Sequence, residues 1–202
     1  MTNELKSTEA LILDAARTIF IRKGFAASRM QEIADAAGIN KSLLHYYFRS
    51  KEQLFEAVFS RALENFIPRV KNIIEAELPL DQKISRFVET YIDTLLQNPY
   101  LPAFVIHELN MNPGKFAGRL KNAGLKPEII LQNIEEETGR EAFLKVRPDH
   151  FMVNLLGLVI FPFIARPVVQ EVLQKTDEQY KTFLMERKEQ IIQFVMNAIT
   201  KT

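Results

Sequence analysis

One short segment concentrates most of the side chains that could bind an anionic polymer. Residues 40–51, NKSLLHYYFRSK, hold two tyrosines, a histidine, a phenylalanine and three lysine or arginine residues. If the segment is a helix, the i, i+3, i+4 spacing of Leu44, Tyr47 and Phe48 places them on one buried face, and Tyr46 points the opposite way. The exposed face therefore carries hydrogen-bond donors and aromatic rings, which suit phosphate oxygens and base edges.

The preceding residues predict the partner helix of a helix-turn-helix. A helix is expected to begin after Ser28 and to continue to Ala37, opened by an S-x-x-Q capping box of Ser28 and Gln31. A three-residue turn from Gly38 to Asn40 follows, and Asn40 is a suitable N-cap for the next helix. Two short helices joined in this way form a helix-turn-helix.

A helix-turn-helix places its second helix in the major groove of DNA, with the first residues of that helix near the base edges. Lys41, Ser42 and Leu43 occupy this position, and Leu43 can contact a thymine methyl. Arg29 and Lys51 lie beside the positive N-terminal ends of the two neighbouring helices, where phosphate oxygens are favoured. The predicted DNA-binding residues are Ser28, Arg29, Lys41, Ser42, Leu43, His45, Tyr46, Tyr47 and Lys51.

These positions differ in the contact expected of them. Loss of the Lys51 charge should weaken binding to all sequences about equally, whereas a change at Leu43 or Ser42 should alter base preference. Leu44 and Phe48 are expected to close a small helical core. For Tyr47 two interpretations stay open, a ring that only packs or a packed ring whose hydroxyl reaches a phosphate. The alternative for the other exposed side chains is a solvated face that binds nothing.

Two other classes of function have to be weighed against DNA binding. Phosphate-binding G-x-G loops and a G-x-S-x-G nucleophile elbow are both absent from the sequence. His107-Glu108 begins like a zincin helix, but Met111 stands where the second histidine would be. We therefore predict no enzyme, no catalytic residue, no metal site and no cofactor. A scaffold that binds protein through the same surface stays open, and DNA retention that falls steeply with salt distinguishes the two.

The composition is that of a globular protein. The 202 residues are 47% hydrophobic and 25% charged, with a net charge of +1 and no cysteine, which agrees with a reducing compartment. The N-terminal residues contain no apolar signal core. The longest apolar run, residues 151–165, is shorter than the roughly 18–20 residues of a membrane span, and Asn154 and Pro162 interrupt it. A cytoplasmic protein without a membrane partner is expected.

Helical periodicity dominates the whole chain, so an all-α protein of about nine helices is expected. A long helix should begin at Ser50, which forms a second capping box with Gln53, and Pro68 should kink it before it ends near residue 77. Asn-Pro, Pro-Gly and single glycines separate the remaining helices. Besides those above, helices are expected over residues 8–23, 81–97, 101–111, 126–138, 148–165 and 177–201.

The segment from Ile12 to Phe55 contains a series of short motifs at fixed spacing. They are Ala15-Ala16, Phe20, Gly24-Phe25, Ile33-Ala34-Asp35-Ala36-Ala37-Gly38, Leu44-His45-Tyr46-Tyr47-Phe48 and Ser50-Lys51-Glu52. In these motifs and throughout their spacing the segment resembles the DNA-binding domain of the TetR family of bacterial transcriptional regulators. His45 stands where that family usually has a tyrosine, Ser42 where glycine is common, and Leu43 where threonine or another small residue is common.

The resemblance implies a ligand-responsive regulator with a DNA-binding domain at residues 1–52 and an effector-binding and dimerisation domain at residues 53–202. It implies a repressor that binds a palindromic operator as a homodimer and is released by a small, largely apolar effector. An effector that acts as a corepressor is the alternative. The effector pocket is expected to be lined from among Phe66, Val70, Phe87, Tyr91, Phe104, His107, Met111, Phe116, Met152 and Phe161.

The resemblance also implies that the last two long helices of each subunit form a four-helix interface between the subunits. Residues 151–164 are hydrophobic nearly all round, so such a helix has to be covered on both sides. The alternative is that both helices belong to the core of a monomer. The predicted interface residues are Leu155, Val159, Phe183, Arg187, Ile191, Phe194 and Val195.

Overall fold

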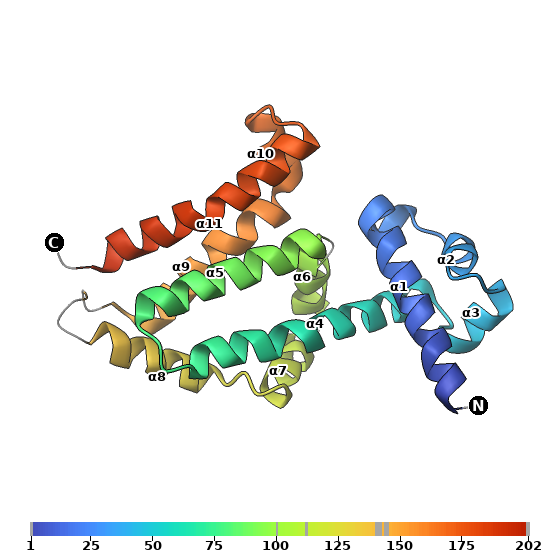
Figure 1. Cartoon of the computed structure of the whole chain (residues 1–202), viewed down its shortest axis with the longest axis horizontal. Helices are drawn as coiled ribbons and strands as arrows, with labels where there is room; N and C mark the ends of the chain where they lie inside the picture. The colour runs from blue at the N-terminus through green and yellow to red at the C-terminus, as the bar shows by residue number, and fades with distance from the viewer. Residues whose placement is uncertain (1, 100, 112, 140–142, 144–145, 201–202) are drawn as a thin grey trace. The chain divides into compact units, whose positions relative to one another are not determined.

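The computed structural model describes residues 2–99, 101–111, 113–139, 143 and 146–200, and the chain is all-α in these ranges (Figure 1). Their only β pairing is an isolated antiparallel bridge between Phe143 and Thr200. The predicted fold class is confirmed. The helices are α1 (Thr2–Ala27), α2 (Met30–Ala36), α3 (Lys41–Tyr47), α4 (Lys51–Glu75), α5 (Leu80–Gln97), α6 (Leu101–Met111), α7 (Pro113–Asn122), α8 (Pro127–Thr138), α9 (Pro148–Ile164), α10 (Arg166–Val172) and α11 (Asp177–Ile199).

The sequence-based prediction of about nine helices missed two short ones, α7 and α10. Both carry a proline in their first turn, Pro113 and Pro167. Proline is tolerated there because the first amides of a helix have no partner within the helix. The two prolines begin helices, whereas the sequence analysis took them only as breaks.

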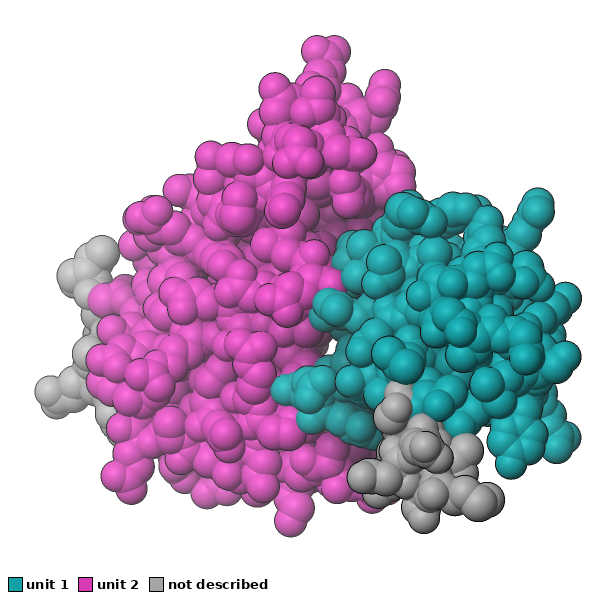
Figure 2. Space-filling view, turned by 45° about the vertical axis from the view of Figure 1, so that its right-hand side comes forward, with its two compact units in different colours: residues 1–65, 98–104 teal, residues 66–97, 105–202 magenta. Residues whose placement is uncertain are grey.

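The chain divides into two compact units, which Figure 2 shows in different colours. Unit 1 comprises residues 1–65 and 98–104, and unit 2 comprises residues 66–97 and 105–202. Helix α4 contributes to both units because the boundary falls between Asn65 and Phe66. The functional boundary after residue 52 stays a prediction.

Unit 1 has a small core to which α1, α2, α3 and α4 all contribute. Ile12, Ile33, Leu44 and Leu54, one from each helix, are completely buried. Phe20 packs edge-on against the ring of Phe55, with ring centroids 4.9 Å apart. These contacts hold the short helices α2 and α3 against the longer ones.

The core of unit 2 is built from α5, α9 and α11, which lie side by side (Figure 1). On α9 the buried positions follow one another at spacings of four, four and three residues, which is one face of a helix. The buried residues of this core are Leu80, Ile84, Val88, Ile92, Phe151, Leu155, Val159, Ile191, Val195 and Ile199.

A proline inside α9 changes how this helix is held. Pro162 has no N–H to donate to the carbonyl of Leu158 four residues earlier. Arg187 of α11 donates to that carbonyl instead, with Nη2 3.1 Å from the oxygen. The carbonyl of Pro162 accepts a hydrogen bond from the hydroxyl of the fully buried Tyr180, also of α11, at 2.7 Å. Burial raises the pKa of Tyr180, so its hydroxyl stays a donor at neutral pH.

Among the described residues, no single helix combines the length and the apolar composition of a membrane span. By length and composition alone, α9 and α10 pass that test only as a pair, and they meet at an angle of 77°.

We predict that Tyr180→Phe lowers the free energy of unfolding by about 1–2 kcal/mol, because it removes the donor to a buried carbonyl. Tyr46→Phe is the matched control, since Tyr46 is 76% exposed, and it should change the free energy by less than about 0.5 kcal/mol. Urea unfolding followed by circular dichroism measures both. Equal stabilities of the two variants would contradict the role assigned to the Tyr180 hydroxyl.

Candidate nucleic-acid interface

The position of α3 is fixed at its start and along its inner face. The side chain of Asn40 accepts a hydrogen bond from the backbone amide of Leu43 at 2.8 Å, so the predicted N-cap is confirmed. Leu44 is completely buried and Phe48 is 8% exposed, as the periodicity predicted. Asn40 and the burial of these two side chains therefore set the orientation of the helix.

The turn between α2 and α3 is closed by a Schellman motif. The amide of Ile39 donates to the carbonyl of Ala34 at 3.0 Å, and the amide of Gly38 donates to Asp35 at 3.1 Å. Gly38 has a φ of +68°, in the left-handed region that favours glycine. The turn therefore has a defined geometry, which fixes the angle at which α3 leaves α2.

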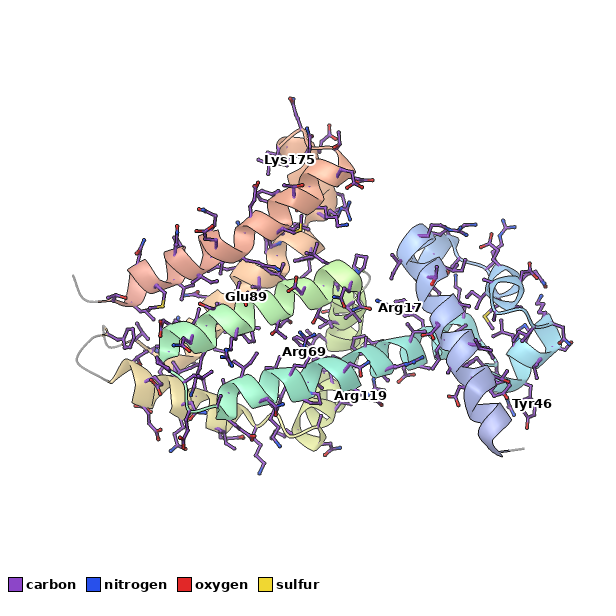
Figure 3. The ribbon with its side chains drawn as sticks, viewed as in Figure 1. Arg17, Tyr46, Arg69, Glu89, Arg119 and Lys175 are labelled. Atoms are coloured by element: carbon purple, nitrogen blue, oxygen red, sulfur yellow. The ribbon has the colours of Figure 1, made fainter. Side chains whose placement is uncertain are left out.

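The outer face of α3 is exposed. Tyr46 is 76% exposed and Leu43 36% exposed, and Figure 3 shows Tyr46 standing clear of the neighbouring helices of unit 1. Tyr47 is half-buried, with its ring edge-on to that of Tyr46 at a centroid distance of 5.6 Å. The side chains of the predicted set that are exposed on α3 are Lys41, Ser42, Leu43, His45 and Tyr46.

Ser28 and Arg29 differ from what the sequence predicted. Arg29, which is exposed, is the N-cap of α2 and makes no side-chain cap. Ser28 is 3% exposed, and its hydroxyl donates to the carbonyl of Phe25 at 2.7 Å. The predicted capping box of Ser28 with Gln31 is wrong, and so is a DNA contact by Ser28, because its hydroxyl is turned into the protein.

Lys51 makes contacts inside the protein that the sequence did not predict. Its ammonium group donates to the backbone carbonyls of Phe25, Ala26 and Ser28 at 2.8, 3.3 and 3.2 Å. It lies 4.4 Å from the centroid of the Phe25 ring as well. These contacts favour an internal role for a side chain that is half-buried, and the phosphate contact of Lys51 stays a prediction.

The first turn of α4 is capped by side chains. The hydroxyl of Ser50 accepts from the amide of Gln53 at 3.2 Å, as predicted, whereas the side chain of Gln53 accepts from the amide of Arg49 at 3.2 Å. The reciprocal half of the capping box is therefore displaced by one residue. Hydrogen bonds from its own amide and from Ser50 lower the pKa of Glu52, so this carboxylate stays charged at the helix start.

The predicted effector residues fall into three groups. Phe66, Phe87 and Tyr91 lie together, with ring centroids 5.0 Å apart for Phe66–Tyr91 and 5.4 Å for Phe87–Tyr91. Burial raises the pKa of Tyr91 to about 12, so its hydroxyl remains neutral. Phe161 is 61% exposed, so its prediction as a pocket residue is wrong. Val70 and Phe116 are buried, Met152 is half-buried, and the side chains of Phe104, His107 and Met111 lie outside the described residues.

The structure contains a cleft in unit 2 that the sequence did not indicate. It lies at the turn between α4 and α5 and along α8, and Asn133 of α8 donates to the carbonyl of Ile74 there at 3.5 Å. None of the predicted pocket residues lines it. No periodic pattern marks such a cleft, because a turn and a distant helix form it together. Its lining residues are Ile74, Glu75, Ala76, Glu77, Leu78, Pro79, Lys83, Ile129, Asn133 and Glu137.

Most of the predicted interface residues are turned inward. Leu155, Val159, Ile191 and Val195 belong to the core of unit 2, and none is more than 9% exposed. A side chain enclosed in its own subunit cannot contact a partner, so these four predictions are corrected. Phe194 is 64% exposed, and Phe183 and Arg187 are half-buried. The residues predicted on α9 therefore lie on its buried face, and of those predicted on the C-terminal half of α11 only Phe194 is exposed.

Another set of apolar side chains is exposed on these helices. On α9, Val153 is 62% exposed, Phe161 61% and Ile164 41%, and Gly157 continues the same face. On α11, Met185 is 45% exposed. On α9 these exposed residues form a face opposite the buried one, and they follow one another at the same spacings of four and three residues.

Comparisons with known proteins agree with a helix-turn-helix in the N-terminal part of the chain. Residues 12–58 match the family model of bacterial regulatory proteins, tetR family. YttP of Bacillus subtilis (strain 168), whose name describes it as a probable HTH-type transcriptional regulator, is 24% identical over 188 residues, which cover 90% of this chain and 91% of YttP. The HTH-type transcriptional regulator RutR of Escherichia coli (strain K12) is 41% identical over 69 residues, which are 34% of this chain and 32% of RutR.

The fold extends the likeness to the whole chain. The solved structure of the ketosteroid transcriptional regulator KstR2 of Mycobacterium tuberculosis is similar with a TM-score of 0.69 and 16% identity, over 96% of this chain and 95% of that one. The helix-turn-helix and the helical unit beyond it define a DNA-binding regulator of transcription. Residues 12–58 belong to the DNA-binding domain of the TetR family of bacterial transcriptional regulators, and the chain as a whole is similar to members of that family. Its relatives regulate transcription, which is a non-enzymatic role.

Proposed function

We propose that this regulator is a repressor that binds a palindromic operator as a homodimer and leaves it when a small, largely apolar effector binds. The observation that carries the DNA-binding part is the exposed face of α3. Its cap at Asn40 and its buried Leu44 hold the helix in one orientation, so the outer side chains are presented at fixed positions. Such a face suits the major groove, and the exposed Arg29 at the start of α2 suits the adjacent phosphates.

Leu43→Ala is predicted to change base preference, because the side chain can contact a thymine methyl. Arg29→Ala is predicted to weaken binding to all sequences about equally. It should also reduce the slope of log affinity against log salt by about two per dimer, because each subunit loses one phosphate contact. Binding should be measured on the duplex that the protein selects from a randomised library and on its single-base variants. If Arg29→Ala reorders the preferred bases and Leu43→Ala does not, the assigned roles are reversed.

The exposed apolar face of α9, with Phe194 of α11, supports a two-fold dimer. Apolar side chains gathered on two helices mark a surface that a partner covers. A two-fold axis through this face repeats it on the second subunit and relates the two α3 helices by the same symmetry. A palindromic operator follows, since each half-site then meets an identical α3.

The double variant Phe161→Glu, Phe194→Glu is predicted to be a monomer at micromolar concentration, whereas the unchanged protein is a dimer. Two carboxylates per subunit would be buried without partners in the proposed interface. Leu11→Glu is the control, because Leu11 of α1 is 54% exposed and lies in unit 1. Light scattering after size-exclusion chromatography gives the masses. A double variant that remains a dimer shows that the subunits associate elsewhere.

The aromatic cluster of Phe66, Phe87 and Tyr91 supports an effector site for a largely apolar molecule. The rings provide apolar surface, and the neutral Tyr91 hydroxyl supplies one hydrogen-bond group. Phe66 stands on α4, the helix that also contributes to unit 1. An effector that fits better when α4 is displaced must therefore disfavour the spacing of the two α3 helices that fits DNA.

Effector binding is predicted to weaken operator binding by roughly 5- to 150-fold, and operator to weaken effector binding by the same factor. Calorimetric titration of small apolar compounds, with and without the selected duplex, measures the factor. Equal affinities in both titrations would show that no coupling exists. Tighter binding in the presence of the duplex would make the effector a corepressor.

A further inference from the structure

The helical path of α1 is broken near its end. Gly24, with φ +76° and ψ 168°, lies at this break. The chain then reaches α2 at Arg29, whose side chain makes no cap. Between the break and Arg29, the carbonyls of Phe25, Ala26 and Ser28 accept hydrogen bonds from a side chain far away in the sequence.

Lys51, the first residue of α4, supplies those donors. Its ammonium group binds the carbonyls of Phe25, Ala26 and Ser28. The Ser28 hydroxyl also donates to the Phe25 carbonyl, and the Phe25 ring packs against Phe55 with centroids 4.7 Å apart. One positive charge therefore ties the residues immediately before α2 to the start of α4.

A second role for the same ammonium group at a phosphate conflicts with these contacts. Its nitrogen lies within hydrogen-bond distance of three carbonyl oxygens, and a phosphate oxygen would have to compete with them for its three N–H groups. Charged hydrogen bonds of this kind are stronger than neutral ones. Arg29 follows Ser28 directly, so whatever fixes the Ser28 carbonyl also fixes where Arg29 and the first amides of α2 lie.

We propose that Lys51 is a positioning residue for DNA binding. It fixes Arg29 and the start of α2 for contact with the DNA backbone, and it does not touch DNA itself. This inference rests on the proposed DNA-binding function. Loss of the Lys51 charge then lowers affinity by misplacing Arg29 and the start of α2, and it removes no phosphate contact made by Lys51 itself.

The test compares Lys51→Met with Lys41→Met, a matched loss of an exposed lysine on α3. Lys51→Met should lower the midpoint of thermal unfolding by several degrees. At a temperature where it is fully folded, it should bind the selected duplex roughly tenfold more weakly, and in the Arg29→Ala background it should leave the slope of log affinity against log salt unchanged, because Lys51 itself makes no phosphate contact. Lys41→Met should keep the unfolding midpoint and reduce the magnitude of that slope by about two per dimer. Lys51→Arg, which keeps a cation with several donors, should recover part of the affinity.

A Lys51→Met variant that keeps the unfolding midpoint, and that lowers the salt dependence further in the Arg29→Ala background, would overturn the proposal. So would wild-type affinity in a folded Lys51→Met variant. Amine labelling of the unchanged protein gives an independent measurement if the variant does not fold. Lys51 should react slowly with an amine-specific ester both with and without the duplex, whereas Lys41 should react quickly and be protected by the duplex. Fast labelling of Lys51 that the duplex suppresses would overturn the proposal.

The same experiments distinguish failure of the inference from failure of the proposed function. If the unchanged protein selects no duplex from the library, DNA binding itself is wrong. The unfolding midpoint of Lys51→Met and the slow labelling of Lys51 in the absence of DNA still test the internal contacts of its ammonium group.

Discussion

A helix of seven residues forms too few internal hydrogen bonds to persist alone in water, so α3 depends on the groups that hold it. Asn40 supplies an acceptor to its first turn, and Leu44 and Phe48 are buried in the core of unit 1. With one face fixed, the opposite face can carry exposed polar and aromatic side chains without loss of the helix. The proposed contact with DNA depends on this division between the two faces.

A comparable constraint shapes unit 2. Pro162 removes one hydrogen bond from α9, and Arg187 of α11 replaces the missing donor at the carbonyl of Leu158. Tyr180 of α11 binds the carbonyl of Pro162 itself. These bonds hold α11 against one side of α9 and leave the opposite side, with Val153, to the proposed partner subunit. The hydrogen bond that α9 lacks at Pro162 and the face that α9 turns outward are therefore linked.

Local sequence was sufficient where the determining interactions are local. The cap at Asn40 depends on residues three positions apart, and the turn at Gly38 depends on one residue that tolerates a positive φ. The burial of Leu44 and Phe48 follows from helical periodicity within a single turn. The all-α class, most helices, the helix-turn-helix and its exposed face could therefore be predicted from the sequence, as could the family.

Tertiary structure decided which side chains are buried, and which groups they contact, at positions where the sequence allows more than one possibility. A helix that is apolar all round, such as α9, gives no signal for which face is inside, and only packing against α5 and α11 buried Leu155 and exposed Phe161. A lysine beside a helix start can bind a phosphate or a carbonyl, and the carbonyls near Lys51 come from residues 23 to 26 positions earlier in the chain. Sequence determined which groups were available, and long-range contacts decided which of them met.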